Sequence, residues 1–163
     1  HDDDGSLGWI VNGETVEQAS TIVRATGLVE ADAPLPAGFS LPAKTGGPVS
    51  PETVWILYRR AAETELLPAS IAIGDSIAVT ASAQALETII SGRGPEEFRL
   101  LVGYAGWGPG QLARELSLGA WLPSAADADL LFHPEHATLW RRAYAEAIGT
   151  VPEAFVSTTR GLA

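Results

Sequence analysis

A continuous apolar run followed at once by a glycine-rich stretch constrains the fold of this chain more than any other feature. Residues Phe98 to Tyr104 are predicted to form a strand buried on both faces, because apolar residues follow one another almost without polar interruption. The overlapping stretch Gly103 to Gly110 is rich in glycine, and a helix is predicted from Gln111 to Leu118. A buried strand, a tight turn and a helix in that order indicate a sheet with a turn at its edge.

Composition favours a single α+β domain. The chain has 163 residues, of which 46% are hydrophobic and 18% charged, and this is enough for a sizeable core. Strands and helices alternate only in part, so we predict an α+β fold rather than a doubly wound sheet. The chain opens on His1 and contains no Met, and we therefore expect its native start to lie upstream.

The remaining elements are predicted from hydrophobic periodicity, turn residues and helix caps. Thr15 is expected to cap one helix, over 16–25, and Ser82 to cap another that ends before Gly92. A run of prolines predicts a long irregular segment over 29–51. Further strands are predicted over 7–12, 53–58, 76–80 and 120–122, and a last helix with Trp140 in a core-facing stripe over 134–148.

Charge and cysteine content exclude several classes of function. The formal net charge is −10, which disfavours binding to phosphate backbones and to anionic membranes. The chain has no Cys, so disulfides, thiol catalysis and thiolate metal sites are excluded. No apolar run is long enough to span a bilayer, and we expect a cytoplasmic protein without membrane contact.

The turn from Gly106 to Gln111 is the candidate ligand site. Free N–H groups at the start of a helix attract anions, and glycine lets another group approach the backbone closely. In this hypothesis Gly108 and Gly110 expose amides, while Trp107 offers a stacking face. The alternative is a purely structural turn in which Trp107 packs on the sheet. The proposed site residues are His1, Asn12, Gly106, Trp107, Gly108, Gly110, Gln111 and Glu115.

Other short motifs have plainer interpretations. Gly74-Asp75-Ser76 resembles an esterase nucleophile turn but lacks the partner residues, so a simple turn is expected. His133 and His136 lack the spacing of a zinc site, and no metal site or cofactor is predicted. Arg59-Arg60 and Arg141-Arg142 are expected to pair with surface carboxylates or with a partner.

Taken together, these residues resemble the YqgE/AlgH family of bacterial proteins. The strongest part of the resemblance is Gly-Tyr-Ala-Gly-Trp-Gly-Pro-Gly-Gln-Leu at 103–112, followed by Glu115 and Trp121. The chain departs from the family at Asn12-Gly13-Glu14, where Asn-Arg-Pro is usual. The supporting matches are His1, Gly5, Gly8, Asn12, Gly46-Gly47-Pro48, Thr80-Ala81-Ser82, Leu131-Phe132 and Trp140-Arg141-Arg142.

The resemblance implies a single domain over 1–163 with a mixed, partly barrel-like sheet flanked by helices, and one or more strands before the position of His1. It implies no assigned biochemical activity, although some members are labelled transcriptional regulators. We therefore expect a non-enzymatic protein that binds a small anionic ligand or a protein partner. Two alternatives stay open: a hydrolase that uses His1 with nearby carboxylates, and a transcriptional regulator, against which the charge argues.

Overall fold

The computed structural model describes residues 4–61, 65–133 and 138–148. The chain divides into two compact units, one formed by residues 7–106 and the other by residues 1–6 with 107–163. The prediction of one domain over the whole chain stays a prediction.

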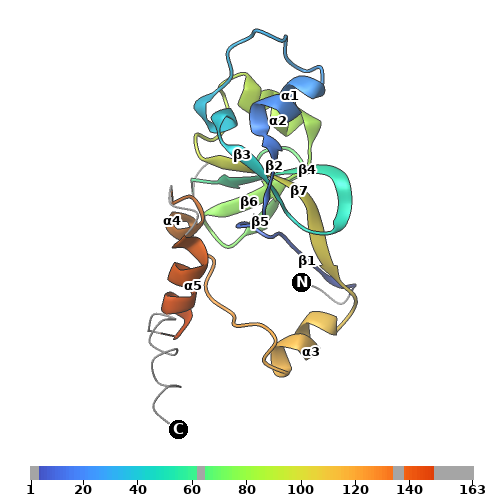
Figure 1. The fold of residues 1–163 in the computed structure, drawn as a ribbon, viewed down its shortest axis with the longest axis vertical. Helices are drawn as coiled ribbons and strands as arrows, with labels where there is room; N and C mark the ends of the chain where they lie inside the picture. Colours follow the sequence, from blue (N-terminus) through green and yellow to red (C-terminus); the bar gives the residue numbers. More distant parts are fainter. Residues whose placement is uncertain (1–3, 62–64, 134–137, 149–163) are drawn as a thin grey trace. The chain divides into compact units, whose positions relative to one another are not determined.

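A mixed seven-stranded sheet is the main feature among the described residues (Figure 1). The strand order is β2-β3-β7-β4-β6-β5, and β1 pairs with β7 outside this path. The β3–β7 pair is parallel, whereas β4 is antiparallel to both of its neighbours. The strands are β1 Ser6–Gly8, β2 Thr15–Gln18, β3 Pro42–Thr45, β4 Val49–Arg59, β5 Ile71–Ile73, β6 Ile77–Thr80 and β7 Phe98–Trp107.

The sheet confirms the α+β class and its mixed pairing. Its path through the described residues ends at β2 on one side and β5 on the other, so the sheet is open rather than a closed barrel. The apolar run predicted as a buried strand is β7, which extends three residues further than expected, to Trp107. Gly74 to Ser76 form the turn between β5 and β6, which confirms the simple interpretation of that motif.

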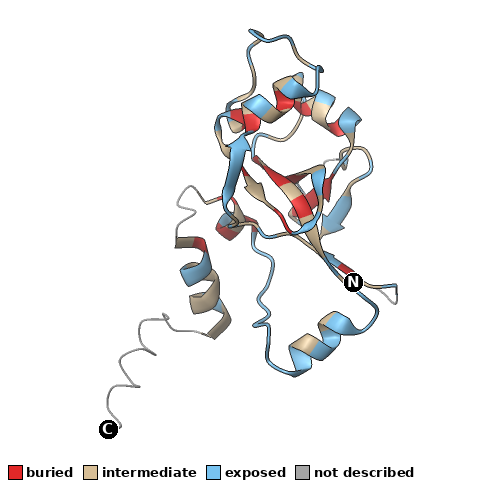
Figure 2. Ribbon diagram, turned by 45° about the vertical axis from the view of Figure 1, so that its right-hand side comes forward, coloured by how far each residue is buried: buried red, intermediate tan, exposed pale blue. Residues whose placement is uncertain are grey.

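Alternation along β4 and β7 builds the core. Ile56 lies opposite Leu100 and Tyr58 opposite Phe98, so these four side chains share one face of the sheet. The helices α1 Ala19–Ala25, η1 Ala37–Ser40 and α2 Ala83–Ile90 supply most of the rest of that core cluster, and β3 and β6 add Ala43 and Ala78. Figure 2 shows buried residues on the sheet and on the inner sides of these helices.

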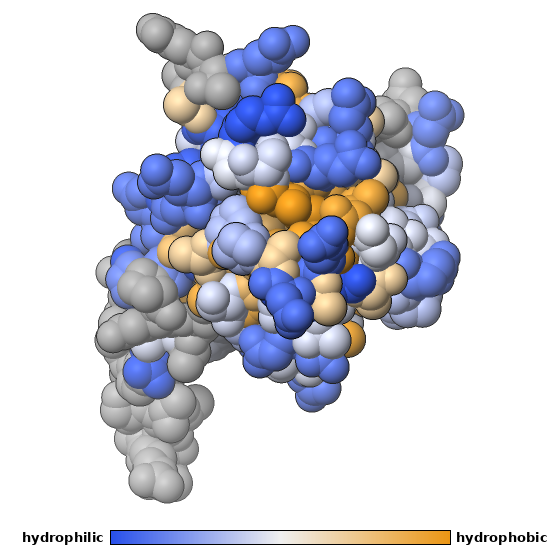
Figure 3. Space-filling model, turned by 90° about the horizontal axis from the view of Figure 1, so that it is seen from above, coloured by the Kyte–Doolittle hydropathy of each residue, from blue (hydrophilic) through white to orange (hydrophobic). Residues whose placement is uncertain are grey.

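The aliphatic and aromatic contacts of this core are close. Val23, Phe39 and Ile89 are at most 1% exposed, and the rings of Phe39 and Phe98 meet edge to face at 4.8 Å. Seen from above, where α1 and α2 lie, hydrophobic residues gather at the centre of the face with hydrophilic residues around them (Figure 3).

The glycines of the 46–48 motif allow two backbone segments to cross. A Cβ on Gly47 would lie 2.1 Å from the carbonyl carbon of Tyr104, and one on Gly103 would lie 2.5 Å from the carbonyl oxygen of Gly47. Gly103 also has a φ of +72°, which favours glycine. A glycine is therefore required at position 103, because any side chain there would collide with the backbone of Gly47.

The second unit holds α3 Gln111–Ser117, α4 Ala128–Leu131 and α5 Leu139–Ile148. Asp127 caps α4 by accepting a hydrogen bond from the Asp129 amide at 2.8 Å. Leu130, Phe132 and Leu139 are buried. No helix within the described part of the chain is long and apolar enough to cross a membrane.

Two local predictions are confirmed, the cap of α2 and the helix after the glycine-rich stretch. The second is α3, which begins at Gln111 as predicted and ends at Ser117. The Ser82 hydroxyl accepts a hydrogen bond from the Ala85 amide at 3.4 Å and caps α2 as expected. Residues 134–137, which include the predicted helix start and His136, lie outside the described residues.

Several other local predictions are wrong. Thr15 begins strand β2 instead of capping a helix, and α1 starts only at Ala19, because residues 15–18 pair with β3. The proline-rich segment contains η1, β3 and the start of β4. The strand predicted over 7–12 is limited to β1, and 120–122 is not a strand. Trp140 is 58% exposed and stacks on Tyr144 instead of entering the core.

Candidate functional site

The turn between β7 and α3 is closed by Gln111, the first residue of the helix. Its backbone N–H donates to the Gly108 carbonyl at 3.0 Å, and the Gly108 N–H donates to the Gln111 side-chain oxygen at 3.1 Å. Gly110, the N-cap, adopts a left-handed conformation with φ +69°, and no side chain caps the helix. Two amides expected to be open are thus bonded within the protein, whereas the Gly110 N–H has no partner among the described residues.

The carboxylate of Glu115 is the centre of the site. It accepts hydrogen bonds from the indole N–H of Trp121 at 2.6 Å, from the Gln111 side-chain amide at 2.9 Å and from the indole N–H of Trp107 at 3.1 Å. The three donors come from the loop after α3, from its first turn and from the end of β7. One side chain of α3 therefore joins three consecutive segments. We call Trp107, Gln111, Glu115 and Trp121 the Glu115 network.

The Glu115 network lowers the pKa of its carboxyl group. The hydrogen bond from Trp121 contributes most, followed by the one from Gln111, because each stabilises the ionised form. The bond from Trp107 acts in the same direction, and partial burial opposes all three. Glu115 is therefore a carboxylate at neutral pH and a weak proton acceptor.

The two indole rings of the network also contact each other. Trp107 and Trp121 meet edge to face, with ring centroids 5.8 Å apart and an interplanar angle of 79°. Trp107 is half-buried, and both its N–H and its ring have partners inside the same unit. The indole predicted as an open stacking face is therefore held in place by Glu115 and Trp121.

Around this network the unit exposes a run of large apolar side chains. α3 contains no buried residue and appears in Figure 2 without the buried colour. Four large apolar side chains within seven residues are 38–77% exposed, with Leu118 the most exposed of them. We call this set the α3 surface, and it comprises Leu116, Leu118, Trp121 and Leu122.

The structure brings four of the predicted site residues together: Trp107, Gly108, Gln111 and Glu115. Gly110 is adjacent in the turn. The remaining three residues are not part of this group: Gly106 and Asn12 belong to the 7–106 unit, and His1 lies outside the described residues. A contribution from Asn12 or His1 stays a prediction.

Two features of this site were missed by reasoning from the sequence. Trp121 was matched to a family but not assigned to the site, because a loop residue six positions after Glu115 has no periodic relation to it. The α3 surface was missed because its leucines fit the apolar pattern of an ordinary buried helix. Among the described residues, no group of three His, Asp or Glu side chains could hold a metal ion.

The family model and the relatives that match this chain all point to the same family of proteins. The AlgH-like family model matches residues 1–151. The UPF0301 protein of Paracoccus denitrificans is 35% identical over 143 residues, which is 88% of this chain and 74% of the relative. A UPF0301 protein of Anaeromyxobacter dehalogenans is 34% identical over 167 residues, covering 96% of this chain and 79% of the relative.

Two solved structures share the fold. The solution structure of the AlgH protein from Pseudomonas aeruginosa matches with a TM-score of 0.67 and 29% identity, covering all of this chain and 80% of that one. The crystal structure of a protein from Corynebacterium diphtheriae matches with a TM-score of 0.68 and 17% identity, covering 89% of this chain and 72% of that one. The second likeness concerns the fold alone.

Proposed function

The chain belongs to the AlgH-like family, and we propose that it acts by binding a protein partner at the α3 surface rather than by catalysing a reaction. The observation that carries the proposal is the exposure of Leu116, Leu118, Trp121 and Leu122 within one short segment. Scattered exposed apolar residues are ordinary, but a cluster around a fixed aromatic residue is typical of protein interaction sites.

The Glu115 network supports this proposal because it fixes the segment that carries the apolar side chains. Trp121 is held by a hydrogen bond to Glu115 and by the ring of Trp107, although it is 48% exposed. An aromatic side chain that is already ordered loses little conformational entropy when a partner covers it. Trp121 therefore has the properties of an interface anchor.

The same network argues against the small anion that the sequence left open as a ligand. The turn amides of Gly108 and Gln111 are bonded within the protein, and the ionised Glu115 carboxylate lies next to them. A bound anion would be repelled by that carboxylate, since the two charges have the same sign. A partner that brings basic side chains around an apolar centre suits both Glu115 and the net charge of −10.

Hydrolysis through Glu115 is less well supported for a different reason. A general base works best with a pKa near the operating pH, and the hydrogen bonds to Glu115 lower its pKa further from neutrality. A role as transcriptional regulator would require DNA contacts that an acidic chain disfavours. A gel-shift titration over a range of salt concentrations tests that alternative directly.

Site-specific photo-crosslinking in cells tests the proposal. A photoreactive amino acid at position 118 should capture a discrete protein, and the same group at Ile71, which is exposed in the other unit, should not capture it. The captured protein, once purified, should bind the wild-type chain and bind Leu118→Asp at least tenfold more weakly. Ile71→Asp serves as the matched control.

Two results would contradict the proposal. One is equal affinity of the purified partner for the wild-type chain and for Leu118→Asp. The other is a nucleotide or sugar phosphate that raises the melting temperature in a thermal-shift screen and also moves the NMR amide signals of Gly108, Gly110 and Gln111, since that result would favour the anionic ligand.

A further inference from the structure

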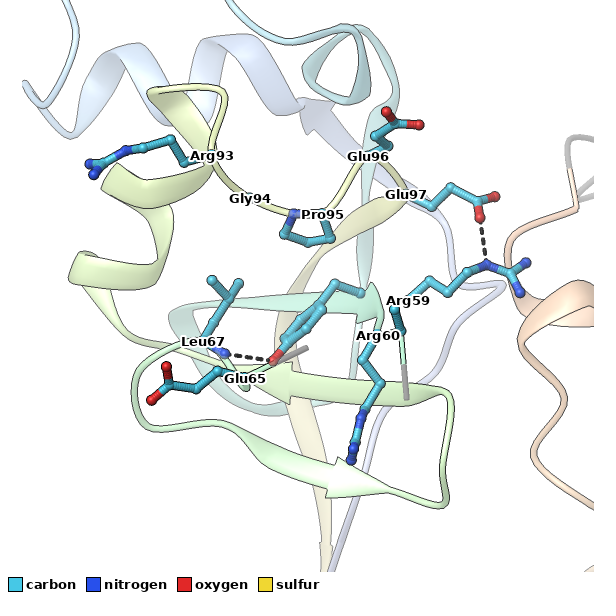
Figure 4. Close-up of a pocket in the computed structure, with 11 residues that line it drawn as sticks. Arg59, Arg60, Glu65, Leu67, Arg93, Gly94, Pro95, Glu96 and Glu97 are labelled. Atoms are coloured by element: carbon cyan, nitrogen blue, oxygen red, sulfur yellow. Dashed lines mark hydrogen bonds and ion pairs between the residues drawn. The ribbon is translucent and has the colours of Figure 1, made fainter. Parts of the chain in front are cut away.

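The 7–106 unit contains a cavity of about 520 Å³ between two connections of the sheet (Figure 4). One wall comes from residues 58–61, 65 and 67, at and beyond the end of β4, and the other from residues 93–97 between α2 and β7. This volume is within the range of small-molecule sites, which is roughly 300–1,000 Å³. The cavity has no residue in common with the α3 surface.

Three arginines line the cavity, and the Nε atoms of two of them, Arg59 and Arg93, already have partners. Arg59 pairs with Glu97 through its Nε at 2.5 Å, which confirms the expected pairing with a surface carboxylate. Arg93 is exposed, donates from its Nε to the Ser91 hydroxyl at 3.0 Å and extends away from Pro95 in Figure 4. The Nε of each of these two side chains is therefore already engaged.

Arg60 is different. Its backbone N–H is fixed by the Ser76 carbonyl at 2.9 Å, so the position of the residue at the end of β4 is defined. Its Nε is removed from solvent and has no hydrogen-bond partner, and no described residue forms an ion pair with its guanidinium. A buried donor on a charged group is costly to leave unpaired, so an acceptor atom from water or from a ligand is expected beside it.

Apolar groups from both walls line the rest of the cavity. Leu67 and Pro95 line it together with Tyr58, whose hydroxyl accepts a hydrogen bond from the Leu67 amide at 3.0 Å and is bonded to Ser70 at 2.9 Å. The hydroxyl of Tyr58 is therefore engaged, and its ring and the two apolar residues can contact only the apolar part of a ligand.

We propose that this cavity binds a small monocarboxylate with an apolar body, whose carboxylate is held by Arg60 and whose body packs against Leu67 and Pro95. A guanidinium offers two parallel N–H donors that match a carboxylate. Glu65 and Glu96 also line the cavity and are exposed, and their negative charge disfavours ligands with several negative charges, such as nucleotides.

Hexanoate is a suitable probe, since it combines one carboxylate with a short apolar chain. In a titration followed by NMR, we expect saturable shifts of the Ala61, Leu67 and Gly94 amides, which line the cavity. Hexanamide, with the same shape but no charge, and acetate, with the charge but no apolar body, should both bind at least tenfold more weakly.

Two variants separate the charge from the cavity. Arg60→Gln should weaken hexanoate binding by about ten- to a hundredfold, whereas Arg114→Gln, which removes one exposed positive charge from α3, should leave it unchanged. Ala61→Phe, at an exposed position of the lining, should weaken binding by filling space without altering charge.

Three outcomes would overturn the proposal: hexanoate produces no saturable shift at the cavity amides, hexanamide binds as tightly as hexanoate, or Arg60→Gln binds hexanoate like the wild type. All of these measurements concern the 7–106 unit. The test is therefore independent of the protein partner proposed for the α3 surface.

Discussion

Helices α2 and α3 have similar lengths but are held in place by different forces. α2 is capped by Ser82 and buries Ala85 and Ile89 in the core. α3 has a glycine at its N-cap, buries no residue and is joined to its neighbours through the hydrogen bonds of Glu115. One helix is stabilised by packing and the other by polar contacts at a partly exposed carboxylate.

This difference in burial indicates that α3, and not α2, has an apolar surface left for a binding partner. A helix that uses its apolar face for the core has none left for a partner. α3 keeps its leucines outside because the Glu115 network replaces core packing as the anchor of this segment. The four predictions that follow test this contrast, beginning with the largest expected effect.

Ile89→Ala should destabilise the protein by roughly 2–5 kcal/mol, because Ile89 is 1% exposed and its loss leaves a cavity under α2. Urea denaturation followed by tryptophan fluorescence measures the change in the free energy of unfolding. Ile71→Ala is the matched control, since Ile71 is 47% exposed and should change stability by less than about 0.5 kcal/mol. Equal effects of the two variants would show that α2 does not depend on burial.

Ser82→Ala should cost roughly 0.5 kcal/mol by removing the cap of α2. The bond to the Ala85 amide is long, at 3.4 Å, so a value at the low end of the range for caps is expected. Ser82→Asp keeps an acceptor at the same position and should restore most of the loss. A Ser82→Asp variant as unstable as Ser82→Ala would mean that the side chain has another function.

Acid pH should loosen α3 before it affects α2. The pKa of Glu115 is lowered in the folded protein, so its stabilising contribution is complete above the pKa of the unfolded chain and disappears as the pH falls through the folded value. The indole N–H signals of Trp107 and Trp121 should therefore stay constant near neutrality and move together only at acid pH, below the ordinary titration range of a glutamate. Glu115→Gln should abolish this titration, and its persistence in that variant would assign it to another group.

Leu118→Ser should have the smallest effect, within about 0.5 kcal/mol, because the side chain is 77% exposed. Thermal denaturation followed by circular dichroism is sufficient to measure it. A loss above about 1 kcal/mol would mean that Leu118 packs inside the protein, and the α3 surface would then be a poor interaction site.

Sequence reasoning predicted those strands and helices whose position depends on local signals within or beside the segment itself. β7 was expected from its apolar run, α2 from Ser82 and its periodicity, and α3 from the glycines before it. Thr15 shows where such reasoning fails. Its capping pattern was outweighed by pairing with Lys44 of β3, a residue far along the chain whose position no local signal indicates.

The candidate site was predicted in part, for a related reason. Trp107, Gln111 and Glu115 lie close together because consecutive elements bring them there. The burial of the Arg60 Nε next to a cavity could not be foreseen, since Arg59 and Arg60 are adjacent identical residues in the sequence. The two residues differ in the folded chain because Arg59 pairs with Glu97, whereas the Nε of Arg60, just beyond the end of β4, has no partner.

The glycine stretch from 103 to 110 has two different tolerances for substitution within eight residues. At Gly103, any side chain would collide with the Gly47 backbone. At Gly108, the closest atom to an added Cβ is the flexible Gln111 oxygen at 3.9 Å. A saturation library should therefore accept nothing at the first position and many residues at the second, so one motif combines a position fixed by steric clearance with a position that tolerates a side chain.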